Sequence, residues 1–148
     1  MEKSDYFKNI ANFIENKILY NKFLGIKLKS LNQGSCQLLL PFKTELLGDP
    51  FRAVVHGGVL STLIDVSGGT ACFSMLKNKK DRLSTVDLRV DFLEPARQND
   101  LICTAKVVRM GNKMGVVHMK IFSNITAQNP ILIATGQGVY NIIRKFNA

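Results

Sequence analysis

The chain has 148 residues, the size of one domain, with 46% apolar and 21% charged residues. This composition excludes a disordered, collagen-like or coiled-coil chain and indicates a globular protein. The net charge of +9 favours anionic partners, such as a nucleic acid, an acidic membrane surface or a phosphorylated small molecule, although a generally basic surface would give the same value.

Several features bear on the cellular location. The polar N-terminus shows no secretory signal, and no apolar run approaches the ~20 residues that cross a bilayer. The three cysteines, Cys36, Cys72 and Cys103, are an odd number without CxxC spacing, which suits reduced side chains better than disulfides or a zinc site. We therefore expect a cytoplasmic protein without a metal site.

The first third of the chain predicts a helix followed by two strands. Apolar residues at steps of three and four positions predict a helix over residues 4 to about 20, within an N-terminal segment 1–22. Two short strands are expected at 26–31 and 35–40, each preceded by a glycine. The turn residues Gly48-Asp49-Pro50 predict that 43–55 is a loop.

A second, strongly apolar helix is expected from Gly57 to about Leu76. One side of it carries a wide apolar stripe, which suits the concave face of a sheet. Another side carries small residues and one acid, and it suggests the close approach of another chain or a ligand. The stripe consists of Leu60, Leu63, Ile64, Ser67 and Ala71, and the small side of Ser61, Asp65, Gly68, Gly69 and Cys72.

From Leu83 onward, apolar and polar residues alternate, which is typical of strands. Four strands are expected at 83–92, 101–110, 115–125 and 131–143, in hairpin succession and therefore antiparallel. A sheet of this kind can bury one apolar helix by wrapping round it. The predicted fold class is α+β.

One part of the sequence resembles a known family. The letters HGGV at 56–59 open the apolar helix, Asp65 follows nine positions after the histidine, and TVDLRVDFLEPA occupies 85–96. Together these motifs resemble the hotdog-fold thioesterases, specifically the PaaI-like acyl-CoA thioesterases, from about Leu24 to Arg144. The resemblance implies a single hotdog domain over 1–148, in which the N-terminal helix precedes the antiparallel sheet and its long central helix.

The resemblance also implies roles for individual residues. The main-chain N–H of Gly57 polarises the thioester carbonyl, and Asp65 of the neighbouring subunit acts as general base or nucleophile. A hydroxyl group early in the following strand often orders water, and the matching position is Thr85, beside Ser84. Related enzymes often carry Asn or Gln six positions before the histidine, where this chain has a proline preceded by Asp49.

Elementary chemistry supports the helix start as an oxyanion site. A helix N-terminus carries unpaired N–H groups and a positive partial charge, and Gly57 and Gly58 lack the Cβ atoms that would hold a ligand away. Asp65 lies eight residues after Gly57, which is about 12 Å along an ideal helix. Unless the substrate bridges both groups, this spacing favours a dimer in which each subunit gives one group to each of two sites.

For the other candidate site residues, the sequence allows either a structural or a functional role. His56 either caps the helix start or hydrogen-bonds near the thioester. Arg109 and Lys113 flank the Gly111 turn, which resembles the turn that many relatives use near the nucleotide, and could contact the phosphates of coenzyme A. The basic cluster at 77–82 could do the same or only complement the helix dipole. Candidate walls of an apolar acyl pocket are Phe51, Phe73, Met75 and Leu76.

The sequence therefore predicts an enzyme that hydrolyses an acyl-CoA or aryl-CoA thioester to the free acid and CoA. The resemblance implies a homodimer or a homotetramer of two dimers, and no cofactor besides the CoA that belongs to the substrate. One alternative is a hotdog hydratase or dehydratase of enoyl or hydroxyacyl thioesters. Another is a non-catalytic acyl-CoA sensor that binds nucleic acid, but no helix-turn-helix or aromatic-laced basic stretch supports it. Neither nucleic acid nor a membrane is expected as a partner.

Overall fold

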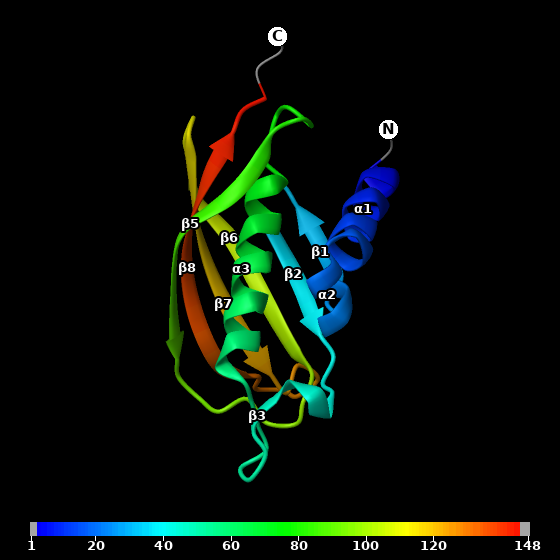
Figure 1. Cartoon of the computed structure of the whole chain (residues 1–148), viewed down its shortest axis with the longest axis vertical. Coiled ribbons are helices and arrows are strands. Elements are labelled where there is room, and N and C mark those ends of the chain that lie inside the picture. Colours follow the sequence, from blue (N-terminus) through cyan, green and yellow to red (C-terminus); the bar gives the residue numbers. More distant parts are fainter. Residues whose placement is uncertain (1–2, 146–148) are drawn as a thin grey trace.

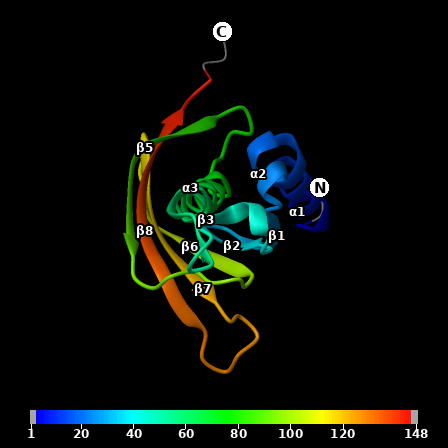
Figure 2. The same cartoon turned by 60° about the horizontal axis from the view of Figure 1, so that its bottom comes forward.

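The computed structural model describes residues 3–145, in which a six-stranded antiparallel sheet curves around the helix α3 (Gly57–Phe73) (Figure 1). Figure 2 shows α3 inside the curve of the sheet, with the N-terminal helices on the side of α3 away from β8 (Ile131–Ile143), while the start of β5 (Arg82–Phe92) reaches toward these helices. This is the α+β arrangement predicted from the sequence. Among residues 3–145, no helix combines the length and the apolar character that a membrane crossing requires.

The predicted N-terminal helix is present but interrupted. The helix α1 (Lys3–Asn12) passes into a π-helical turn (Phe13–Lys17), and the extended residue Ile18 separates this turn from α2 (Leu19–Leu24). The buried side-chain amide of Asn21 donates to the main-chain carbonyl of Ile14 (3.0 Å), which supplies a partner for a carbonyl near the break.

The N-terminal segment is also bonded to the edge of the sheet. The Glu15 carboxylate accepts a hydrogen bond of 2.9 Å from the main-chain N–H of Leu28 in the edge strand β1 (Lys27–Asn32). A strand edge offers unpaired main-chain groups, and here a side chain of the N-terminal segment satisfies one of them. The N-terminal helical segment therefore packs against the edge of the sheet and is hydrogen-bonded to it.

The sheet has the order β1-β2-β6-β7-β8-β5, so one prediction about its pairing is wrong. The strand β5 pairs with β8 and not with β6, which follows it in the chain. The connecting residues are bonded elsewhere: the N–H groups of Leu93 and Glu94 bond to the Ile133 carbonyl, and the carbonyl of Ala96 accepts from Val55. The remaining strands are β2 (Ser35–Leu40), β6 (Leu101–Met110), β7 (Met114–Ser123) and β8 (Ile131–Ile143).

Two other boundaries differ from the expectation. The expected loop 43–55 contains a 3-10 turn (Thr44–Leu46) and a small sheet of β3 (Leu47–Asp49) and β4 (Val54–Val55). The helix α3 ends at Phe73 rather than Leu76 because Ser74 caps it: its hydroxyl donates to the Ala71 carbonyl (2.6 Å) and accepts from the Gly34 N–H (2.8 Å).

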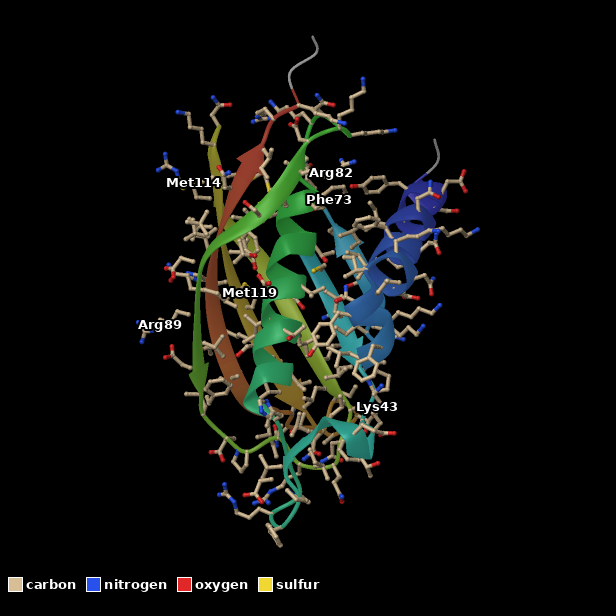
Figure 3. All side chains as sticks on the ribbon, viewed as in Figure 1. Lys43, Phe73, Arg82, Arg89, Met114 and Met119 are labelled. Carbon is tan, nitrogen blue, oxygen red and sulfur yellow. The ribbon has the colours of Figure 1, made fainter. Side chains whose placement is uncertain are left out.

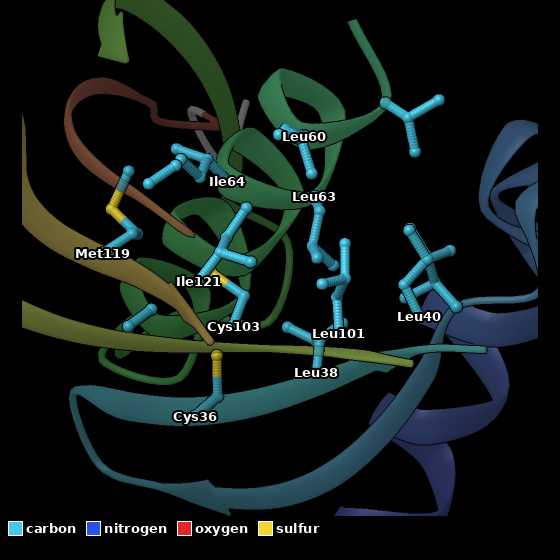
Figure 4. Close-up of a cluster of buried hydrophobic side chains, with 14 of the residues drawn as sticks. Cys36, Leu38, Leu40, Leu60, Leu63, Ile64, Leu101, Cys103, Met119 and Ile121 are labelled. Atoms are coloured by element: carbon cyan, nitrogen blue, oxygen red, sulfur yellow. The ribbon is translucent and has the colours of Figure 1, made fainter. Parts of the chain in front are cut away.

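The core lies between α3 and the concave face of the sheet, as the apolar stripe predicts (Figure 4). Leu63 and Ile64 of α3 are completely buried there. A Cβ on Gly136 of β8 would lie 2.5 Å from the Ile64 side chain, so this glycine lets the sheet approach the helix closely. The facing side chains of the sheet include Leu38, Leu101, Cys103, Met119 and Ile121.

The small side of α3 faces mostly the chain's own sheet, so the idea that it receives another chain or a ligand is wrong for part of its length. A Cβ on Gly68 would collide with the hydroxyl of Tyr140 on β8. Cys72 is fully buried, and its sulfur lies 2.5 Å from the position that a Cβ on Gly115 of β7 would take. The partly exposed members of the small side are Ser61, Asp65 and Gly69.

Candidate active site

Asp65 lies in the middle of α3 and is hydrogen-bonded to two strands, β5 and β8. Its side-chain Oδ1 accepts a hydrogen bond of 2.8 Å from the hydroxyl of Thr85 on β5. Its main-chain carbonyl accepts one of 2.9 Å from the hydroxyl of Tyr140 on β8. The structure thus brings together Asp65 and Thr85, two residues that the sequence singled out, and it adds Tyr140.

Tyr140 is suited to act as a permanent donor. The residue is buried, and burial together with the nearby Asp65 raises the pKa of its phenol above the ordinary value. The hydroxyl therefore stays protonated at neutral pH and continues to donate to Asp65. No feature of the sequence pattern around residue 140 indicated this contact.

A cavity of about 280 Å³ opens beside Asp65. The side chains that line it are mostly apolar and come from four parts of the fold: the N-terminal segment, α3, the start of β5, and β8. This environment suits an apolar ligand placed next to one carboxylate. The lining residues are Phe13, Ile14, Ile18, Asp65, Val66, Gly69, Thr70, Phe73, Arg82, Leu83, Thr85 and Tyr140.

One of the four residues predicted as pocket walls lines this cavity. Of the four candidates, Phe73 lines the cavity beside Asp65, and its end of α3 lies near Arg82 (Figure 3). Phe51 is 99% exposed at the tip of the β3–β4 loop, and Met75 packs against the turn at Gly34. Leu76 follows the end of α3 and is absent from the lining of this cavity.

The start of α3 is capped by its own histidine. The Nδ1 atom of His56 accepts a hydrogen bond of 2.8 Å from the main-chain N–H of Gly58. A Cβ on Gly58 would lie 2.9 Å from that nitrogen, so the cap needs glycine there. Within residues 3–145, the N–H of Gly57 has no hydrogen-bond partner, and the ring of Phe92 is its neighbour.

Asp49 is the last residue of β3, close to this helix start, and its carboxylate bonds to the turn that follows it. Its carboxylate pairs with Arg52 (Oδ2 to Nε, 2.6 Å) and accepts hydrogen bonds from the main-chain N–H groups of Phe51 and Arg52. These bonds, led by the one from the Arg52 side chain, hold the pKa of Asp49 below its usual value. Among residues 3–145, Asp49 has no hydrogen bond or ion pair with His56 or Gly57.

The other predicted binding residues lie away from the cavity. Ser84 is exposed, and because side chains alternate along a strand, it points to the opposite face of β5 from Thr85. Arg109 and Lys113 are exposed at the β6–β7 hairpin, near the C-terminal end of α3 and far from Gly57 (Figure 1). The 17 residues of α3 span about 25 Å, so one subunit does not bring these basic groups to the Gly57 amide.

Comparison with known proteins agrees with the family resemblance seen in the sequence. The family model described as the thioesterase superfamily matches residues 53–127. A Halobacterium salinarum protein that is provisionally named an esterase is 36% identical over 139 residues, 91% of each chain. The Salmonella typhimurium protein named medium/long-chain acyl-CoA thioesterase YigI is 27% identical over 135 residues, 83% of this chain and 84% of the relative.

A solved structure supports the same assignment. The crystal structure of a Shewanella oneidensis protein described as related to the thioesterase superfamily has a TM-score of 0.81 at 27% identity, and the match covers 93% of this chain and 95% of that one. The curved antiparallel sheet around one central helix is the hotdog fold, and the family match and the thioesterase relatives show a thioester hydrolase. The chain belongs to the thioesterase superfamily. The predicted fold and enzyme class are confirmed.

Proposed function

We propose that the protein hydrolyses an acyl-CoA thioester to the free acid and CoA. The observation that carries this proposal is the Asp65 carboxylate, bonded to Thr85 at the side of an apolar cavity of about 280 Å³. The relative named medium/long-chain acyl-CoA thioesterase supports an aliphatic acyl group of medium or greater length. Because CoA belongs to the substrate, we expect no further cofactor.

The chemistry needs a carboxylate and a donor to the carbonyl oxygen. Thr85 occupies Oδ1 of Asp65, and the second carboxylate oxygen is then free to take a proton from water as the water oxygen attacks the thioester carbon. Alternatively, that carboxylate oxygen attacks the carbon itself, and water later releases the acid. In the first route the C–S bond breaks and the CoA sulfur takes the proton that Asp65 accepted from water. In the second route CoA leaves as the thiolate when the mixed anhydride forms, and the water that later cleaves the anhydride supplies the proton that the thiolate takes up.

The donor to the carbonyl oxygen is the Gly57 N–H at the start of α3. The positive end of the helix dipole lies there and further stabilises the negative charge that develops on that oxygen. Loss of one oxyanion donor costs about 3 kcal/mol in comparable enzymes. Within one subunit this amide lies about 12 Å along α3 from Asp65, so we propose that the Gly57 of one subunit faces the Asp65 of another.

The strand β5 supports such a dimer because its outer edge is unpaired in the single chain. Apolar side chains are exposed along this edge and just after it, including Val86 (57%), Phe92 (55%) and Leu93 (52%). A long exposed edge of this kind is suited to pairing with a second copy. In that assembly Arg109 and Lys113 remain our candidates for the phosphates of CoA. The three free, buried cysteines agree with a reducing, cytoplasmic location.

The decisive experiment measures CoA release from a panel of aliphatic and aromatic CoA thioesters with a thiol-reactive dye. We expect aliphatic acyl-CoA esters to be cleaved. The Asp65→Asn variant should fold normally and lose at least about a hundredfold in kcat. The matched control is Asp87→Asn, which changes an exposed acid on β5.

Three results would contradict the proposal. Release of no thiol from any ester would exclude hydrolysis of CoA thioesters. A change in double-bond absorbance without thiol release would indicate the hydratase alternative. Unchanged turnover in Asp65→Asn would remove Asp65 from the mechanism.

A further inference from the structure

The π-helical turn Phe13–Lys17 lies directly on the cavity beside Asp65. The N–H of Ile18 bonds to the carbonyl of Phe13 at 3.2 Å, five residues back rather than four. Turns of this kind are rare and occur often at functional sites. Phe13, the first residue of the turn, and Ile18, the residue after it, both line the cavity.

Three residues of this turn and its end line the cavity: Phe13, Ile14 and Ile18. Ile14 and Ile18 are four positions apart, the spacing that places two side chains on one face of a helix. Phe13, one position before Ile14, lines the same cavity, while Lys17 is exposed to solvent. The turn therefore presents three apolar side chains to the cavity and its lysine to water.

The two ends of the cavity differ in chemistry. Asp65 and Thr85 form one end, and the cavity follows α3 for eight residues, about 12 Å, to Phe73. There the ring of Phe73 stacks on the ring of Phe13, with centroids 6.4 Å apart and planes inclined by 15°. An acyl chain whose carbonyl lies at Asp65 would meet this stacked pair with its methyl end.

We propose that Phe13, at the start of the π-helical turn, closes the end of the acyl cavity opposite Asp65 while Ile18 forms part of its wall, and that the turn thereby limits the length of the acyl chain that the enzyme accepts. This inference rests on the proposed acyl-CoA hydrolysis. Phe13 is 46% exposed and Phe73 belongs to α3, so Phe13 is the part of the barrier whose removal opens the cavity to solvent. Longer chains could then extend past Phe73.

The experiment compares kcat/KM for butyryl-, octanoyl-, lauroyl- and palmitoyl-CoA in the full-length protein and its variants. In Phe13→Ala the ratio of palmitoyl-CoA to octanoyl-CoA should rise by at least about tenfold, since the added methylenes gain room. The matched control is Phe23→Ala. Phe23, in α2, is also an exposed aromatic residue in a stacked pair, with Tyr20, but it does not line the cavity.

A second pair of variants tests the turn itself. Ile18→Ala should raise KM for octanoyl-CoA severalfold through lost apolar contact, whereas Lys17→Ala should leave the chain-length profile unchanged. Thermal unfolding of each variant verifies that it folds. If Lys17→Ala alters the profile as much as Ile18→Ala, or if Phe13→Ala and Phe23→Ala have the same profile, the inference is wrong. Failure of the wild type to release CoA from any ester would instead overturn the proposed function.

Discussion

The hydroxyl of Tyr140 donates a hydrogen bond of 2.9 Å to the main-chain carbonyl of Asp65, so strand β8 holds α3 at the residue that bears the candidate catalytic carboxylate. The carbonyl of a helical residue already accepts from the N–H four residues later, and this bond uses its second lone pair. Because Gly68 lies one turn further on and has no side chain, the phenol can reach that carbonyl. Tyr140 is therefore a positioning residue for Asp65.

Replacement of Tyr140 by Phe removes the hydroxyl and keeps the ring. We expect the free energy of unfolding to fall by about 1 kcal/mol, the net value of a buried hydrogen bond. The kcat for acyl-CoA should fall by a smaller factor than in Asp65→Asn, with little change in KM, because the carboxylate remains but is less well held. Urea denaturation and steady-state kinetics measure the two effects. A KM effect without a kcat effect would contradict the positioning role.

The adjacent glycines Gly68 and Gly69 predict opposite effects of the same substitution. Gly68→Ala should destabilise the protein, because the new Cβ would collide with the hydroxyl of Tyr140. Gly69→Ala should stabilise it by about 0.5–1 kcal/mol through higher helix propensity, since its Cβ would meet the Tyr140 ring at an ordinary 3.5 Å. Thermal or urea unfolding of both variants tests the contrast.

Gly69→Ala should also alter catalysis, because Gly69 lines the cavity beside Asp65. The added methyl group takes space from the acyl chain, so the preference should move toward shorter esters. The chain-length panel measures this shift. A stabilised variant with the wild-type profile would show that the acyl chain does not pass this residue.

Thr85 should affect turnover more than binding. Thr85→Val keeps the shape of the side chain and removes the hydroxyl that donates to Asp65 Oδ1. We expect kcat to fall by about tenfold, because the carboxylate loses one charge-assisted hydrogen bond, and Thr85→Ser should restore most of the activity. Ser84→Ala removes the neighbouring hydroxyl on the other face of β5 and serves as the control. An equal loss in both variants would contradict the assigned role of Thr85.

The sequence predicts those parts of the fold that depend on local pattern. Apolar spacing predicts α3 and the strands, with ends that agree with the structure to within about three residues. The pairing of β5 with β8 is not local, because it depends on where the chain passes after Phe92. At the break near Ile18, the Asn21 amide bonds to a carbonyl seven residues earlier, which is a contact that no residue spacing predicts. Neither feature has a periodic signal.

The candidate site also contains residues that the sequence predicts and residues that only the fold brings in. The motif around His56, Gly57 and Asp65 could be recognised because it lies on one helix, and Thr85 because it belongs to the strand that follows. Tyr140 is 75 positions from Asp65 and was missed, as were Phe13 and Ile18. The apolar stripe of the N-terminal helix indicates that it packs on something, but only the fold shows that this includes the cavity wall. The catalytic and binding roles stay predictions until the variants are measured.

The buried thiols predict how stability depends on pH. Burial raises the pKa of Cys72 from 9.0 to about 11 and that of Cys103 to about 12, and it also raises the pKa of Cys36. Above pH 9.0 the unfolded chain loses these protons while the folded chain keeps them. The unfolded state then binds fewer protons, so the free energy of unfolding falls as the pH rises above 9.0. Each thiol contributes a slope of at most about 1.4 kcal/mol per pH unit, and only until the pH reaches its folded pKa, about 11 for Cys72.

Urea denaturation at a series of pH values on both sides of 9.0 tests this dependence. We expect a plateau below pH 9.0 and a steep fall above it. Cys103→Ala should reduce the slope above pH 9.0 by about one proton, in addition to a loss of stability at all pH values from the smaller side chain. In the folded protein the same thiols should react slowly with the dye used for CoA release. An unchanged slope in Cys103→Ala would show that this thiol ionises equally in the folded and unfolded chains.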